Sequence, residues 1–112
     1  MRLQTDTKAL VLSVLAHGAN HGYGIAKTVR EGSGGVLKLG EGQLYPTLHS
    51  LEEAGFVTSG WEGDGEQKRR IYSITPAGRS DLAARAARWN SFTEGVSKIL
   101  EFGGNEALEV CQ

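Results

Sequence analysis

The sequence lacks several features that mark large classes of proteins. It has one cysteine, Cys111, among 112 residues, so it has neither the second thiol of an internal disulfide nor that of a thiolate zinc site. It contains no run of about 20 apolar residues that crosses a bilayer. Its first six residues also lack the apolar segment of a secretory signal. These absences predict a cytoplasmic protein with no membrane partner.

Groups that usually carry catalysis are also scarce. His17, His21 and His49 lie in separate segments, so no catalytic triad or metal-ligand spacing is present. The glycine-rich segment 32–35 lacks the lysine of a phosphate-binding loop. We therefore expect no enzyme, no catalytic residues, no metal site and no cofactor. His21 is instead expected to cap or pack at the start of a helix.

The chain has no excess of positive charge. Its 12 basic and 13 acidic residues give a formal net charge of −1. Overall charge therefore gives no indication of nucleic-acid binding, and such a role requires cations clustered on one face. The hydrophobic fraction of 39% suits one small domain with a modest core.

The first 40 residues predict two helices and a short strand. Residues 6–17 form the first helix, with capping residues at its start and Gly18 at its end. Leu12 lies beside the apolar stripe of this helix, which suggests a surface covered by a partner subunit. A second helix covers residues 25–30, and residues 36–39 read as a strand that pairs with a later hairpin.

The segment 43–54 predicts a short helix with an exposed polar side. Leu44, Leu48 and Leu51 form its apolar stripe. Pro46 predicts that the helix starts no earlier than Gln43 or is bent. The candidate DNA-contacting residues of this helix are Gln43, Tyr45, Pro46, Thr47, His49 and Ser50.

A hairpin follows this helix. Residues 56–61 and 68–74 alternate as strands, and the turn between them is acidic. Lys68, Arg69 and Arg70 form a basic shoulder, and we expect one of the two arginines to reach the DNA backbone or the minor groove while the other pairs with an acid. A presented helix beside a basic hairpin indicates a winged helix-turn-helix, in an α+β fold that is mostly α.

A long helix is predicted from Thr75 and Pro76 to about residue 102. Its apolar residues repeat in heptads, which favours a seam buried by a second copy of the chain. With Leu12, the predicted dimer interface comprises Leu82, Trp89, Phe92, Val96 and Ile99. The predicted units are a DNA-binding domain (1–75), a dimerisation helix (76–104) stopped by two glycines, and a tail (105–112).

Several motifs in order resemble the PadR family of bacterial transcriptional regulators over about residues 8–80. They are HGYGI at 21–25, GGVL at 34–37, EGQLYPTL at 41–48, LEEAGF at 51–56, RRIY at 69–72 and ITPAG at 74–78. The resemblance implies a homodimeric repressor that binds an inverted-repeat DNA operator. It also implies that the Leu-Tyr-Pro motif belongs to the recognition helix, and the chain is similar in length to short members with a single C-terminal helix.

The resemblance further implies a small aromatic effector. Some short members bind planar, often cationic drugs at the dimer centre against a tryptophan of the last helix, and Trp89, with Phe92 after it, stands at a comparable place. The alternative is that Trp89 is a dimer-core residue. The alternative function is a winged-helix module for protein contacts without operator binding, which the net charge of −1 and the acidic wing tip favour.

Overall fold

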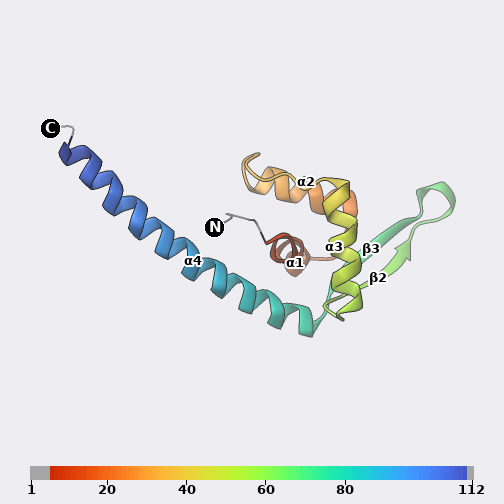
Figure 1. Cartoon of the computed structure of the whole chain (residues 1–112). Coiled ribbons are helices and arrows are strands. Elements are labelled where there is room, and N and C mark those ends of the chain that lie inside the picture. The colour runs from red at the N-terminus through yellow and green to blue at the C-terminus, as the bar shows by residue number, and fades with distance from the viewer. Residues whose placement is uncertain (1–5, 111–112) are drawn as a thin grey trace.

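The computed structural model describes the backbone of residues 6–110 and the side chains of residues 6–103. The described residues form four α-helices, one 3₁₀ turn and three short strands, and Figure 1 shows how the helices and the hairpin are arranged. The elements are α1 (Thr7–His17), β1 (Asn20–His21), α2 (Gly22–Gly32), α3 (Glu41–Glu53), β2 (Val57–Glu62), the 3₁₀ turn η1 (Gly65–Gln67), β3 (Arg69–Ile74) and α4 (Pro76–Val110). The predicted fold class, mostly helical with a small antiparallel sheet and a long C-terminal helix, is confirmed.

The sheet has the order β1-β3-β2, and its third strand is not the predicted one. Residues 36–39 form no strand, and β3 pairs instead with Asn20 and His21. Gly34 and Gly35 both have positive φ and turn the chain, after which Leu39 packs into the core. Two paired residues are too few to show an alternating pattern, so β1 has no periodicity by which it could be predicted.

The core lies between α1, α2, α3 and the sheet. Its buried residues are Val11, Leu12, Leu15, Ile25, Val29, Leu39, Leu44, Leu48, Leu51, Val57 and Tyr72. The prediction that Leu12 faces a partner subunit is wrong, because its side chain is fully buried within its own chain. Helix α1 packs against α2, α3, α4 and β3, which explains its wide apolar surface.

Helix α3 begins at Glu41, two residues before the earliest start that was predicted for an unbent helix. Pro46 therefore lies inside the helix, where it cannot donate to the carbonyl of Gly42 and its ring crowds that group. Gly42 has open space around it, so the first turn can adjust. Leu44, Leu48 and Leu51 are buried as the apolar stripe predicted.

Helix α4 starts as predicted and extends further than predicted. Thr75 Oγ1 accepts a hydrogen bond from the Gly78 N–H at 3.0 Å, and Pro76 is the first helical residue. The helix leaves the body of the domain and continues through residues 103–104 to Val110, so the predicted stop there is wrong (Figure 1). Glycines lower helix propensity, but they end a helix when they adopt a left-handed conformation. Of the predicted tail, residues 105–110 are helical, and Cys111 lies outside the described residues.

None of the helices in the described part of the chain is both long enough and apolar enough to span a membrane.

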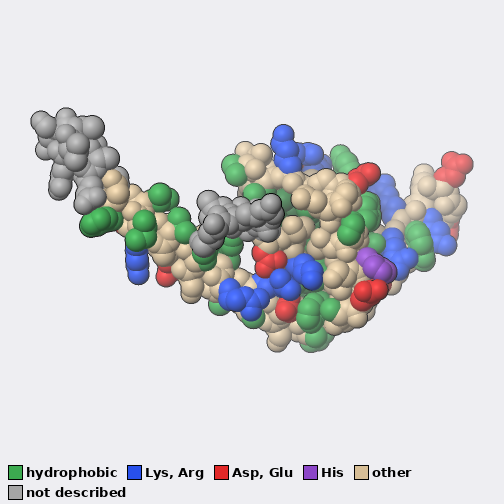
Figure 2. Space-filling view, in the orientation of Figure 1, with side chains coloured by type: hydrophobic (Ala, Val, Ile, Leu, Met, Phe, Trp, Pro, Cys, Tyr) green, Lys and Arg blue, Asp and Glu red, His purple; other side chains and the backbone are tan. Residues whose placement is uncertain are grey.

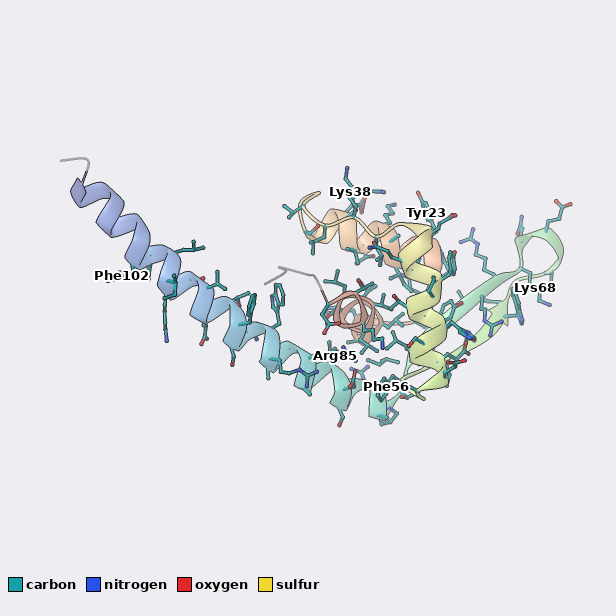
Figure 3. All side chains as sticks on the ribbon, viewed as in Figure 1. Tyr23, Lys38, Phe56, Lys68, Arg85 and Phe102 are labelled. Atoms are coloured by element: carbon teal, nitrogen blue, oxygen red, sulfur yellow. The ribbon has the colours of Figure 1, made fainter. Side chains whose placement is uncertain are left out.

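An ion-pair cluster joins the start of α4 to the start of α1. Arg85 Nη1 lies 3.2 and 3.1 Å from the two carboxylate oxygens of Asp6, and its Nε lies 2.6 Å from Asp81 Oδ2. Asp6 also caps α1 by accepting from the Ala9 N–H at 3.1 Å. The hydrogen bond to Asp81 and then that to Asp6 raise the pKa of Arg85, while burial opposes them. Figure 3 shows Arg85 on the side of α4 that faces α1.

We expect Asp6→Ala to lower the free energy of unfolding by about 1–2 kcal/mol, because it removes a helix cap and a partly buried ion pair. Urea denaturation at one fixed protein concentration measures this loss. Asp6→Asn is the matched control, since it keeps an acceptor for the Ala9 N–H and should lose about half as much. Equal losses in both variants would show that the cap contributes nothing.

Candidate nucleic-acid interface

The outer side of α3 carries the residues predicted to meet DNA. Gln43, Pro46 and His49 are exposed, whereas Thr47 and Ser50 are half-buried. The Thr47 hydroxyl donates to the Gln43 carbonyl at 2.7 Å, and His49 Nε2 lies 3.0 Å from Glu53 Oε1 one turn later. Gln43, Pro46 and His49 therefore lie on the exposed side of α3, and their contact with bases stays a prediction.

Tyr45 is directed toward α2. A methyl group placed on Gly22 would lie 2.6 Å from the Tyr45 hydroxyl oxygen, so the phenol rests directly against the backbone at the start of α2. The sequence grouped Tyr45 with Gln43 at the N-terminal end of α3, but the structure separates the two side chains. Glycine at position 22 is what leaves room for the ring.

Two of the three wing cations are held by neighbours. Arg70 Nε donates to Ser59 Oγ at 2.9 Å, and its Nη2 lies 3.6 Å from Glu52 Oε1. Arg70 and Lys68 also lie over the ring of Trp61, with distances to the ring centroid of 5.5 and 5.1 Å. Arg70 is therefore the arginine that pairs with an acid, as one of the two was expected to.

Arg69 is oriented differently. Its Nη1 lies 3.2 Å from His21 Nε2, the contact that joins the wing to the start of α2. Glu62 is its cross-strand neighbour, yet within the described side chains no carboxylate lies at ion-pair distance from Arg69. The guanidinium charge of Arg69 is thus available to a ligand.

A pocket of about 340 Å³ opens where α2, α3 and β3 meet. It is lined by His21, Gly22, Tyr23, Tyr45, Arg69, Arg70 and Tyr72. The rings of His21 and Tyr23 are stacked, with centroids 6.4 Å apart, and burial raises the pKa of Tyr72 although Arg70 lowers it. Tyr23 and Tyr72 were not predicted to lie in the interface, and His21 was predicted only to cap or pack at the start of a helix. Nothing in the sequence spacing shows that residues 21–23 lie next to residues 69–72.

The charges of the interface are segregated. Figure 2 shows basic side chains at the base of the wing and acidic side chains at its tip. The overall net charge of −1 therefore conceals a local cationic surface between α3 and the hairpin, which is the distribution that binding to DNA phosphates requires.

Helix α4 carries a separate apolar surface. Trp89 is 41% exposed and Ile99 72%, while Phe92 and Val96 are half-buried, and the rings of Trp89 and Phe92 lie 5.8 Å apart. Leu82 differs from these residues, because it packs partly against the chain's own core. Figure 3 shows Phe102 well beyond the body of the domain.

A second pocket, of about 210 Å³, lies between α1 and α4 beside Trp89. Its lining is Asp6, Ala9, Leu10, Ser13, Leu37, Leu82, Ala86, Trp89 and Asn90. Among the described side chains, no three His, Cys, Asp or Glu residues come together as a metal-binding group.

Comparison with known proteins gives a consistent result. The model of the transcriptional regulator PadR-like family matches residues 11–84. A transcriptional regulator of Mycobacterium tuberculosis is 38% identical over 74 residues, which cover 66% of this chain and 69% of the relative. A transcriptional regulator from Clostridium thermocellum has a similar structure, with a TM-score of 0.76, 27% identity and coverage of 82% and 90% of the two chains.

Bacillus subtilis PadR in complex with operator DNA is also similar. The TM-score is 0.66 and the identity 27%, and the match covers 72% of this chain but 46% of that one. The family and these relatives are transcriptional regulators and not enzymes, as the sequence predicted. With the winged fold, the basic pocket and the matched residues 11–84 together, the chain belongs to the PadR-like family of transcriptional regulators.

Proposed function

We propose that the protein acts in the cytoplasm as a homodimeric repressor that binds an inverted-repeat DNA operator. The observation that carries the proposal is the position of α3, whose free polar side lies beside a wing with an unpaired cation, Arg69. The N-terminal part of α3 enters the major groove, and the wing contacts the backbone. The similarity to a PadR bound to operator DNA supports this arrangement.

The dimer is inferred from α4. With 35 residues, the helix is about 50 Å long, and it extends well past the body of the domain. Trp89, Phe92, Val96 and Ile99 recur at spacings of three and four residues on one side of it. A two-fold copy of the same helix buries this seam and places the two α3 helices in a fixed relation, which an inverted repeat matches.

DNA binding is tested with a duplex selected by the protein from a random-sequence library. Fluorescence anisotropy should show affinity for this duplex that falls steeply as salt rises, because cations of the wing displace counterions from phosphates. A stable dimer that enriches no sequence and binds no duplex at low salt would favour the alternative, a winged-helix module for protein contacts.

We further infer that a planar aromatic effector enters the pocket beside Trp89 and releases the operator. The pocket has apolar walls from Leu10, Leu37 and Leu82 and one indole ring, a combination that suits a planar aromatic ligand. Since the pocket lies between α1 and α4, a ligand there biases the angle between the domain and the dimerisation helix. Release follows if the ligand prefers the angle that does not fit the operator.

Titration with ethidium in the absence of DNA tests the effector site. In a Trp61→Phe background, in which Trp89 is the remaining tryptophan, we expect saturable quenching at about one dye per protomer, since each chain has this pocket, and a micromolar Kd. Trp89→Phe should weaken dye binding, followed by the dye's own fluorescence, while the dimer persists. Absence of quenching with an intact dimer, or loss of the dimer in Trp89→Phe, would instead make Trp89 a structural residue.

A further inference from the structure

We propose that His21 and Arg69 together hold one phosphate of the DNA backbone in the pocket between α2, Tyr45 and the wing. The inference rests on the proposed function, and it names a DNA contact outside α3. A free phosphate ion and a DNA phosphodiester offer the same anionic oxygens to such a pocket. The position of the pocket beside α3 and the wing points to the phosphodiester of DNA.

The first step is the hydrogen position on His21. Its Nδ1 lies 3.1 Å from the Gly24 N–H and accepts from it, which caps α2. A neutral imidazole has one acceptor nitrogen and one N–H. Because Nδ1 is committed as the acceptor, the hydrogen is on Nε2, and Nε2 is a donor.

The second step is the group that faces this donor. Arg69 Nη1 lies 3.2 Å from His21 Nε2, and a guanidinium has no acceptor. Two donors therefore converge at this point without an acceptor between them. A ligand with two acceptor oxygens, placed beside both groups, satisfies both N–H donors at once.

The third step is the charge and shape of the pocket. Tyr45 brings a hydroxyl group against Gly22, and the Glu52 carboxylate is paired with Arg70. The pocket is lined by Tyr45 of α3 and by Arg69 and Arg70 of β3, so an anion held there lies between the recognition helix and the wing. A phosphodiester fits, because its two non-bridging oxygens share one negative charge.

Two variants remove the two donors separately. Arg69→Ala removes the guanidinium, and His21→Asn removes Nε2–H while keeping a favoured helix-capping side chain. We expect Arg69→Ala to weaken binding of the selected duplex about tenfold or more and to reduce the salt slope by about one. His21→Asn should weaken binding several-fold, and the double variant should be little weaker than Arg69→Ala, because both groups hold the same phosphate.

Lys68→Ala is the matched control, since it removes one wing charge but does not line the pocket. Single neutral methylphosphonate linkages are then placed along the selected duplex. The wild type should lose affinity at one linkage in each half-site, Arg69→Ala should be insensitive to that linkage, and Lys68→Ala should remain sensitive to it.

The outcomes separate the proposals. If the wild type binds no duplex, the proposed function fails. If the wild type binds DNA but both variants keep its affinity and salt slope, the phosphate contact alone is overturned. A third outcome also overturns the DNA contact. If millimolar inorganic phosphate shifts the His21 ring signals in NMR spectra, while no methylphosphonate linkage affects the wild type more than Arg69→Ala, the pocket holds a free anion and not a DNA phosphate.

Discussion

Val96→Asp combined with Ile99→Asp is expected to convert the protein into a monomer that no longer binds its operator. Both side chains line a shallow groove on α4 that also includes Phe92 and Leu100, and Ile99 is among the most exposed apolar residues of the described chain. The two-fold dimer would bury four carboxylates without partners, which is costly in an apolar interface. We expect the dimer dissociation constant to rise at least about a thousandfold, equivalent to about 4 kcal/mol.

Sedimentation velocity measures the association, and anisotropy with the selected duplex measures binding. Ala87→Asp with Ser97→Asp is the matched control, because it adds the same charges at exposed positions that helical geometry turns away from the seam. The control should remain a dimer. A double Val96/Ile99 variant that stays dimeric would place the interface elsewhere and remove α4 from the proposed mechanism.

Gly78→Ala is expected to destabilise the domain more than any other single methyl group added to its glycines. A Cβ at this position would overlap the Phe56 carbonyl oxygen and lie 2.8 Å from Ile74 Cγ1. The same carbonyl accepts from the Thr75 N–H at 3.0 Å, so it cannot move without loss of that bond. We expect the free energy of unfolding to fall by about 3 kcal/mol and Tm by about 15 °C.

Thermal and urea unfolding measure this effect. Gly42→Ala is the matched control, because it adds the same methyl group in a helix where nothing lies within 4 Å. It should leave stability unchanged or raise it by up to about 1 kcal/mol. If Gly78→Ala is no less stable than Gly42→Ala, the junction between the wing and α4 is looser than its contacts indicate.

The features that sequence predicted well are the local ones. The stripe of Leu44, Leu48 and Leu51, the Thr75 cap and the two wing strands each depend on spacing within one segment. The errors arose where distant segments decide the outcome. Leu12 is buried because α1 is surrounded by its own chain, and β1 exists because β3 offers a free edge to residues 20–21.

The candidate site was predictable in composition but not in arrangement. The sequence placed two arginines on the wing without distinguishing them, since the difference depends on Glu52 and Ser59 near Arg70 and on His21 near Arg69. Tyr45 was assigned to the right helix, yet its direction depends on Gly22, 23 positions away in the sequence. Such contacts have no local periodicity to reveal them.

The ion pairs of Arg85 attach α4 to the start of α1 at one point, and the rest of the helix extends beyond this attachment. Val96 lies 11 residues beyond Arg85, about 16 Å along the helix axis. A tilt of α4 by about 5° at Arg85 would therefore displace Val96 by about 1.5 Å relative to the body of the domain. In the proposed dimer each half tilts, and the distance between the two α3 helices changes accordingly. Substitution of Asp6 or Asp81 would then change the half-site spacing that the dimer binds best. It would do so without any substitution in the DNA-contacting surface or in the dimer seam.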